Sequence, residues 1–234
     1  MNKHWINPDL LAPNVLEIDV PAAVLDPLRT LVPLLQAQRP GNPPLVTPDG
    51  LNLHIHHHPD WDSDILWITQ FDEPTYRHLE AVFDALAIAA QVEGRIAFDE
   101  RVVLYTTMFV TRSRCDAAHL HFDWLNMDND AFTFLTPLSE NGCAIDLLYE
   151  DFRGQPRTYR YRHGKGLIFG SHFHHSTAPG KADEPAVLLA FQFGTDRMDR
   201  YKAILKSAYQ GAFHRRPDGR FVRSGVAQDA VQAV

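Results

Sequence analysis

The run Val102-Val103-Leu104-Tyr105-Thr106-Thr107-Met108-Phe109-Val110-Thr111 is rich in β-branched and aromatic residues, which favour β-strands. Shorter runs of the same kind follow it, separated by turn-forming residues: residues 131–138, 143–150, 157–162, 167–169 and 186–193. Many short strands at this spacing are typical of a β-sandwich or a β-barrel. The sequence therefore predicts a mainly β fold for this part of the chain.

The region before these strands is helical or mixed. Residues 72–94 predict one helix, with Asp72 as its N-cap and Gly94 at its end. Residues 19–38 have helical spacing of apolar residues but contain three prolines, so any helix there is short, broken or kinked. We expect the helix at 72–94 to pack against the outside of a sheet.

The chain length suits a single domain over residues 1–234. Within it we expect a helical and mixed part at about residues 1–100, a β core at 101–194, a C-terminal helix at 195–211 and a tail at 212–234. No internal repeat interrupts this order.

The tail contains four arginines, Arg215, Arg216, Arg220 and Arg223. A solvated tail is the preferred interpretation, because chain termini are usually mobile. A phosphate-binding lid and a subunit contact are the alternatives.

Composition and charge limit the kinds of partner. The formal net charge of -7 argues against binding of nucleic acid or anionic membranes, because both require a basic surface. The two cysteines form no Cys-x-x-Cys pair, and no apolar run reaches the roughly 18 residues of a membrane span. The N-terminus also lacks the apolar region of a signal peptide. These features predict a cytoplasmic protein with a small-molecule substrate, and they leave the oligomeric state open.

His121-Phe122-Asp123 is the leading candidate for a metal site. A strand places residues i and i+2 on one face, so the side chains of His121 and Asp123 can enter the same interior. Together with a second histidine they would occupy one face of an octahedral metal, as in non-haem Fe(II) oxygenases. A core histidine beside a solvated aspartate is the alternative. A second copy of the pattern, His58-Pro59-Asp60, is read as a strand end and loop, because its proline removes a ladder donor.

Three histidines compete for the remaining ligand position: His172, His174 and His175. If a strand register holds through this segment, Phe169, Phe173 and His175 share one face, whereas His172 and His174 share the other. His175 is therefore the preferred ligand, and His174 is the second choice.

Residues 166–169, Gly-Leu-Ile-Phe, lead into the string His-Ser-Thr-Ala-Pro-Gly at 175–180. With the His-x-Asp pattern, this arrangement resembles the Fe(II)/2-oxoglutarate-dependent dioxygenase superfamily, in particular its phytanoyl-CoA-hydroxylase-like branch. The resemblance covers about residues 101–194.

The resemblance implies a double-stranded β-helix, or cupin-like jelly roll, with helices that buttress it. It implies that His121, Asp123 and His175 are the metal and catalytic residues, with Fe(II), 2-oxoglutarate and dioxygen as cofactor and cosubstrates. The implied activity is hydroxylation of a C–H bond in a small molecule, such as an amino acid or a related metabolite. Asp123 favours hydroxylation over halogenation, because related halogenases replace this carboxylate with a small residue.

Similar enzymes bind the C5 carboxylate of 2-oxoglutarate with an arginine about eleven residues after the distal histidine, because a guanidinium matches a carboxylate. Counted from His175, that position is Ala186 in this chain. Three other residues are candidates for cosubstrate binding: Arg112, Gln192 and Lys181.

Arg112 is the first of these candidates. On a continuous strand it shares a face with Met108 and Val110, and exposure at a strand end is the alternative. Gln192 shares a face with small residues of its own strand, where it is either a ligand contact or the polar end of a core strand. Lys181 is the weakest candidate, since a turn residue is usually solvated.

Other functions stay open at this point. Ala186 at the arginine position favours a cupin-type iron dioxygenase that does not use 2-oxoglutarate. A metal-free jelly-roll binding module is another possibility, in which the histidines only stack and form hydrogen bonds. Hydroxylation of a peptide is also open, because peptide-modifying members of the superfamily have the same core.

Overall fold

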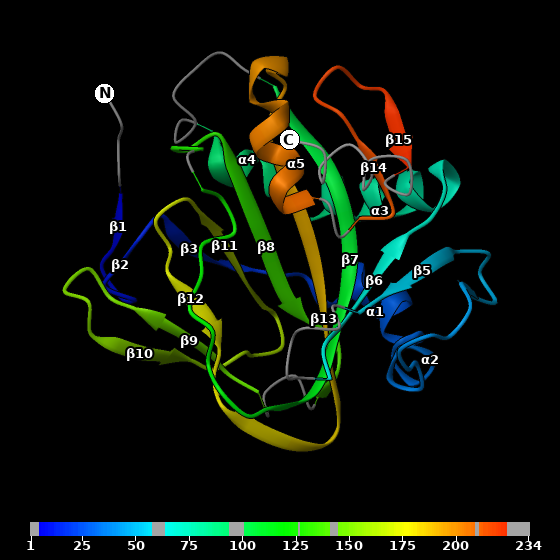
Figure 1. The fold of residues 1–234 in the computed structure, drawn as a ribbon, viewed down its shortest axis with the longest axis horizontal. Coiled ribbons are helices and arrows are strands. Elements are labelled where there is room, and N and C mark those ends of the chain that lie inside the picture. Colours follow the sequence, from blue (N-terminus) through cyan, green and yellow to red (C-terminus); the bar gives the residue numbers. More distant parts are fainter. Residues whose placement is uncertain are drawn as a thin grey trace.

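Two antiparallel β-sheets form the frame of the chain (Figure 1). The computed structural model describes residues 5–57, 64–93, 101–125, 127–140, 145–208 and 211–223. In chain order its elements are β1 (Ile6–Asn7), β2 (Ala12–Pro13), β3 (Val15–Asp19), α1 (Ala22–Arg29), α2 (Val32–Gln36), β4 (Leu45–Val46), β5 (Asn52–His56), β6 (Leu66–Gln70), α3 (Glu73–Ala85), α4 (Ile88–Val92), β7 (Val102–Cys115), β8 (Ala131–Pro137), β9 (Leu147–Glu150), β10 (Pro156–Tyr159), β11 (Lys165–Gly170), β12 (His175–Thr177), β13 (Gly180–Thr195), the 3-10 helix η2 (Met198–Arg200), α5 (Tyr201–Ala208), β14 (Phe213–Arg215) and β15 (Phe221–Arg223).

The larger sheet has eight strands in the order β3-β11-β8-β13-β7-β6-β5-β4, and the smaller one has three in the order β10-β9-β12. From β8 to β13 the chain passes back and forth between these sheets, so strands that are neighbours in space are often distant in sequence. This is the arrangement of a jelly roll, and it confirms the predicted fold class.

Strand β13 shows how the alternation of side chains sorts the two faces of the larger sheet. One set packs into the main core with helices α1 to α4: Val187, Leu189, Phe191 and Phe193. The other set lines a cavity on the opposite face: Leu188, Ala190 and Gln192. The helices therefore buttress the outer face of the sheet, and the inner face is left for a site.

The N-terminal part supplies strands as well as helices. Strands β3 to β6 belong to the larger sheet, which therefore extends beyond the predicted core at 101–194. The three prolines lie at the N-cap of α1 (Pro21), inside α1 (Pro27) and in the first turn of α2 (Pro33). The expectation of short, broken helices there is confirmed.

The prediction of one helix over residues 72–94 is wrong in its length. Its start is confirmed, because the Asp72 carboxylate accepts a hydrogen bond from the Thr75 amide at 2.9 Å. The break comes at Ala87, whose φ of 50° lies in the left-handed region and separates α3 from α4. Gly94, the expected end, lies outside the described residues.

The C-terminal helix is shorter than residues 195–211. Strand β13 includes Thr195, and η2 comes before α5. The solvated tail is wrong for residues 213–223, because β14 and β15 form a hairpin whose phenylalanines join the main core. Arg215 forms an ion pair with Glu80 at 2.9 Å, so at least one of the tail arginines binds the body of the protein.

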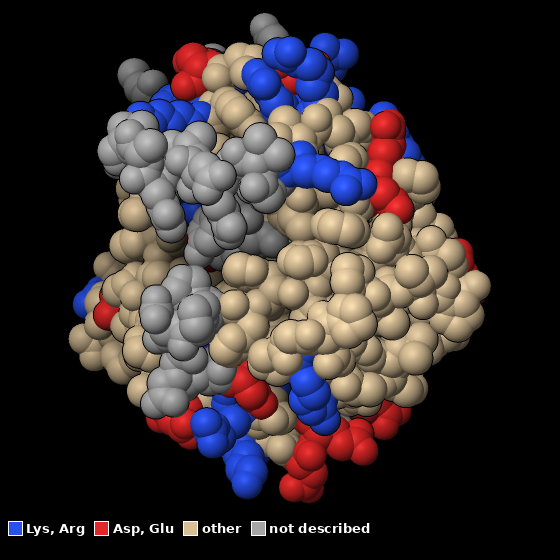
Figure 2. Space-filling view, turned by 45° about the vertical axis from the view of Figure 1, so that its right-hand side comes forward, with Lys and Arg blue, Asp and Glu red and all other residues tan. Residues whose placement is uncertain are grey.

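No described helix is long and apolar enough to cross a membrane. On the face shown in Figure 2, the described charged side chains lie mainly along the upper and lower margins, and both signs occur at each. Among the described residues, few charged side chains lie on the surface between these margins.

Candidate metal centre

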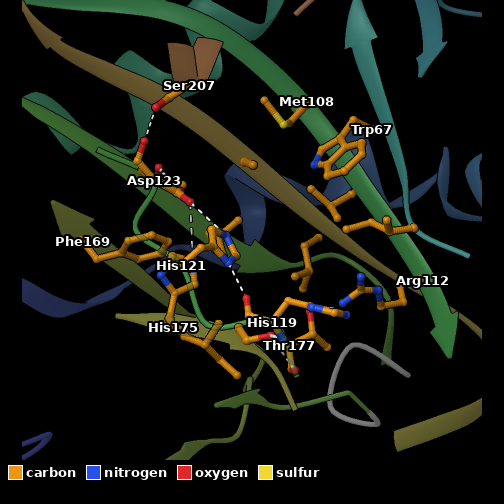
Figure 3. A pocket seen from close by; sticks show the side chains of 18 of the residues that line it. Trp67, Met108, Arg112, His119, His121, Asp123, Phe169, His175, Thr177 and Ser207 are labelled. Carbon is orange, nitrogen blue, oxygen red and sulfur yellow. Dashed lines mark hydrogen bonds and ion pairs between the residues drawn. The ribbon is translucent and has the colours of Figure 1, made fainter. Parts of the chain in front are cut away.

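Three side chains converge in the cavity between the two sheets (Figure 3). One ligand atom each from His121, Asp123 and His175 lies within 4.8 Å of the others. Asp123 Oδ1 is 3.4 Å from His121 Nε2 and 3.6 Å from His175 Nε2. The cavity has a volume of about 240 Å³. Two imidazoles and one carboxylate facing a cavity form a ligand set that suits Fe(II).

An isolated β-bridge brings the two histidines together. His121 and His175 exchange backbone hydrogen bonds of 2.9 and 3.0 Å, which adds His121 to the edge of the smaller sheet beside β12. The prediction that His121 and Asp123 lie on one strand is wrong, because the pairing stops after His121 and Asp123 lies in a bend. Their side chains nevertheless meet, since the bend turns the carboxylate back towards both imidazoles.

Backbone carbonyls orient both imidazole rings. His121 Nδ1 lies 2.8 Å from the carbonyl oxygen of His119, and His175 Nδ1 lies 3.0 Å from that of Phe173. A carbonyl can only accept, so each Nδ1 carries the proton and each Nε2 presents a lone pair when the ring is neutral. Both Nε2 atoms face Asp123, and this is the tautomer that a metal ligand requires.

Burial and mutual charge set the protonation of the three groups. Burial opposes ionisation of Asp123, but the two histidines and a hydrogen bond from Thr133 outweigh it and hold the pKa of Asp123 well below its usual range. Burial lowers the pKa of His175, and the charge of Asp123 offsets only part of this effect. Burial also acts on His121, but the hydrogen bond and charge of Asp123 raise the pKa of His121 above its ordinary value. The site is therefore an anionic carboxylate between a neutral and a more basic imidazole.

The other histidines of the second cluster lie elsewhere. His174 Nδ1 lies 2.6 Å from Glu150 Oε2, and its ring stacks on Phe122 with the ring centroids 4.6 Å apart. His172 has a φ of 70°, so the continuous strand alternation expected for this segment is interrupted. His175 still meets Phe169, with their ring centroids 4.6 Å apart, through packing rather than through strand register.

The structure separates the three cosubstrate candidates. Arg112 and Gln192 line the cavity, whereas Lys181 is exposed and does not line it. Arg112 lies directly opposite Ala186 on the neighbouring strand, so the guanidinium comes from β7 at the level where the expected arginine of β13 is missing. Burial lowers the pKa of Arg112, but an arginine side chain stays charged at neutral pH.

Gln192 lies at the other end of the same strand. It is six residues beyond Ala186, which corresponds to about 20 Å along a strand. Its side chain is buried, and its Oε1 atom has no hydrogen-bond partner among the described residues. Arg112 and Gln192 therefore line the same cavity at different levels of the larger sheet.

The remaining histidine-rich segment forms no comparable cluster. Among the described residues, the triad is the only group of three or more His, Cys, Asp or Glu side chains arranged to hold a metal ion. His54 stacks on Phe71 and His56 packs beside Trp67. His58 and Asp60 lie outside the described residues.

Several hydroxyl groups around Asp123 were missed by the sequence reasoning. Thr133 Oγ1 donates to Asp123 Oδ2 at 2.6 Å, and Ser207 Oγ donates to the Asp123 carbonyl. Ser171 Oγ donates to the carbonyl of Trp124 at 2.8 Å. Trp124 itself is buried and does not line the cavity. No local pattern marks these contacts, because the partners are far apart in the sequence.

Comparisons with known proteins agree with the fold. No protein-family model and no curated sequence matches this chain. Among solved structures, an oxidoreductase of the 2OG-Fe(II) oxygenase family from Burkholderia pseudomallei has 10% identity and a TM-score of 0.52, covering 77% of this chain and 85% of that one. A prolyl hydroxylase from Trichoplax adhaerens, in complex with a peptide fragment of the hypoxia inducible factor oxygen degradation domain, has 16% identity and a TM-score of 0.52, covering 78% and 84%. HygX from Streptomyces hygroscopicus, with nickel, 2-oxoglutarate and hygromycin B bound, has 13% identity and a TM-score of 0.51, covering 81% and 88%.

The chain has the fold of the 2OG-Fe(II) oxygenases. The phytanoyl-CoA-hydroxylase-like branch stays a prediction.

Proposed function

We propose that this protein is an Fe(II)- and 2-oxoglutarate-dependent oxygenase that hydroxylates a C–H bond of a small molecule. The convergence of His121, Asp123 and His175 in the cavity of a jelly roll is the observation that carries this proposal. The donor set fits Fe(II), because two neutral nitrogens and one carboxylate leave positions open for other ligands. With iron bound, oxidative decarboxylation of 2-oxoglutarate to succinate and carbon dioxide activates dioxygen for attack on a C–H bond.

The residues around the triad would keep the site dry and ordered. Phe169 packs on His175, and the ionised Asp123 lies partly buried beside His175. Trp67 and Met108 form part of an apolar wall on the larger sheet. Such a wall excludes water and strengthens the electrostatic interactions inside the cavity.

Arg112 is the proposed anchor for the C5 carboxylate of 2-oxoglutarate. It lines the cavity from the strand beside Ala186, and its partly buried guanidinium can donate two parallel hydrogen bonds to a carboxylate. Lys181 is not proposed to bind 2-oxoglutarate, because its side chain is exposed outside the cavity. Gln192 is too far along β13 to share the same carboxylate, which favours a role towards the primary substrate.

The primary substrate is proposed to be compact. The cavity volume of about 240 Å³ is below the roughly 300–1,000 Å³ of sites for drug-sized ligands. An amino acid or a related metabolite fits this size. The cytoplasmic location and the exclusion of nucleic-acid and membrane partners stay predictions from composition and charge.

An anaerobic titration tests the proposal in two steps. The apo-protein is titrated with Fe(II) and then with 2-oxoglutarate, while the weak visible charge-transfer band of a chelated 2-oxoglutarate complex is followed. Appearance of the band in the wild type, and its loss in Asp123→Ala, is the expected result.

The other functions correspond to other outcomes of the same titration. Iron binding without the band would favour a dioxygenase whose substrate binds the metal directly. Absence of iron binding would favour a metal-free binding module, which would also show no metal-dependent rise in thermal stability.

A further inference from the structure

Asp123 has no strand to hold it. His121 is bridged to β12, but the backbone at Asp123 forms a bend and makes no ladder pairing. A ligand on an unpaired segment needs other contacts to fix both its backbone and its side chain, because a metal site tolerates little misplacement. Three hydroxyl groups from three separate elements provide such contacts.

The first hydroxyl acts on the carboxylate. Thr133, on β8, donates to Asp123 Oδ2 at 2.6 Å. The same hydroxyl accepts a hydrogen bond from Trp124 Nε1 at 3.0 Å. An indole N–H can only donate, so the single proton of the Thr133 hydroxyl is left for Asp123. The two hydrogen bonds form a relay from Trp124 through Thr133 to Asp123 Oδ2. The relay leaves Oδ1 as the oxygen that faces both imidazole Nε2 atoms.

The relay begins at a fixed point. Trp124 is only 1% exposed and belongs to a cluster with Tyr105 of β7 and with Ile204 and Ala208 of α5. Its indole ring therefore has no room to turn away from Thr133. The donor at the start of the relay is set by core packing rather than by the metal site.

The other two hydroxyls act on the backbone. Ser171, in the turn after β11, donates to the carbonyl of Trp124 at 2.8 Å. Ser207, on α5, donates to the carbonyl of Asp123, as the dashed line in Figure 3 marks. The two consecutive carbonyls are thus tied to different elements, and α5 is connected directly to the candidate ligand.

We infer that Thr133, Ser171 and Ser207 form a hydroxyl clamp that positions Asp123 for metal binding, with Thr133 as the residue that orients the carboxylate. The inference rests on the proposed metal site and deepens it. These are positioning residues, since each of their hydroxyls donates to Asp123 or to its neighbour Trp124. Removal of the Thr133 hydroxyl would leave the part-buried Oδ2 without this donor, so the carboxylate would be free to turn.

The test measures Mn(II) affinity of the apo-protein by isothermal titration calorimetry, because this readout does not depend on turnover. Thr133→Val is expected to weaken binding about 10- to 100-fold, the usual cost of losing an outer contact to a metal ligand. Thr133→Ser keeps the hydroxyl and is expected to stay within about threefold of the wild type. The double variant Ser171→Ala/Ser207→Ala is expected to weaken binding by about three- to tenfold, since hydrogen bonds to the backbone are individually modest.

Thr136→Val is the matched control. Thr136 is a buried threonine on the same strand, and its hydroxyl donates to the Lys165 carbonyl at 2.9 Å, away from the site. Its substitution also removes one buried hydroxyl from β8, so it is expected to lower the melting temperature without changing Mn(II) affinity. Equal losses of affinity in Thr136→Val and Thr133→Val would reduce the effect to general destabilisation and overturn the clamp.

Asp123→Ala separates failure of the clamp from failure of the site. If Asp123→Ala abolishes binding while folded Thr133→Val binds within about threefold of the wild type, the clamp is overturned and the metal site stands. If the wild type itself does not bind, both the site and the clamp are overturned. Should Thr133→Val not fold, the double serine variant decides, and unchanged affinity there overturns the clamp.

Discussion

The two walls of the cavity are built in different ways. Long paired strands of the larger sheet form one wall, called the sheet wall below. Met108, Arg112 and Gln192 face the cavity from this wall through regular alternation on β7 and β13. The other wall, called the ligand wall below, carries the three candidate metal ligands. His121 lies at an isolated bridge, Asp123 in a bend, and His175 at the first residue of the three-residue strand β12. A long strand orients its side chains through its own ladder, whereas the ligand wall depends on carbonyls and hydroxyls from distant elements. The side chains of the sheet wall are therefore oriented by their own strands, whereas those of the ligand wall are oriented by tertiary contacts.

The largest expected effect comes from the ligand wall. His175→Ala is expected to abolish Fe(II) binding and 2-oxoglutarate turnover, because one of three ligands is lost. His174→Ala is the matched control, since the neighbouring imidazole pairs with Glu150 near the surface, and such partly exposed pairs contribute little. Calorimetry and succinate release measure both effects. A folded His175→Ala protein that keeps metal while His174→Ala loses it would move the third ligand to His174.

The next effect tests the sheet wall. Arg112→Met is expected to raise the dissociation constant for 2-oxoglutarate about 10- to 150-fold, because a charge-assisted hydrogen-bond pair contributes about 1.5–3 kcal/mol. Lys181→Met removes an exposed cation on the paired strand and is expected to change the dissociation constant for 2-oxoglutarate little. The charge-transfer band of the iron complex reports the affinity. If Lys181→Met has the larger effect, the proposed anchor is wrong.

A pH titration tests the electrostatics of the ligand wall. In the metal-free protein, Asp123 raises the pKa of His121 above its ordinary value of 6.5, so His121 becomes protonated as the pH falls through that raised pKa. Because the metal must displace this proton, Mn(II) affinity is expected to fall about tenfold per pH unit below the raised pKa. His175 has a lowered pKa and adds no second proton near neutrality. Affinity that stays constant between about pH 8 and 6 would contradict this assignment.

The smallest expected effect distinguishes the two ends of the sheet wall. Gln192→Leu is expected to leave 2-oxoglutarate affinity within about twofold of the wild type, because Gln192 is about 20 Å along β13 from the level of Arg112. The same titration used for Arg112→Met measures it. A loss as large as that of Arg112→Met would place the cosubstrate at the Gln192 end and reverse the proposed arrangement.

Local patterns predicted those parts of the chain where a strand or a cap acts alone. The N-cap at Asp72 and the shared face of Met108, Val110 and Arg112 needed only neighbouring residues, and both are present. The single helix at 72–94 is wrong because a left-handed residue breaks it at Ala87, a position with no glycine or proline to mark it. The prediction of a solvated tail is wrong for a similar reason. The hairpin of β14 and β15 is held by contacts with α3 and with the main core, which no local pattern marks.

The choice of His175 over His174 shows the limit of such patterns. Strand alternation selected the residue that the structure places beside His121 and Asp123, although that alternation is interrupted at His172. The placement comes from the bridge between His121 and His175 and from packing on Phe169.

The sequence by itself determined the mainly β fold, the strands β7, β8, β11 and β13 of the larger sheet and the residue types able to hold a metal, because alternation and composition are local. Tertiary structure decided the rest. It brought the ligands together across a bridge, supplied an arginine from β7 where β13 has Ala186, and surrounded Asp123 with hydroxyls from β8, the β11 turn and α5. The physical reason is that a hydrogen bond or an ion pair between distant segments depends on the packing of the whole chain, which no local pattern encodes.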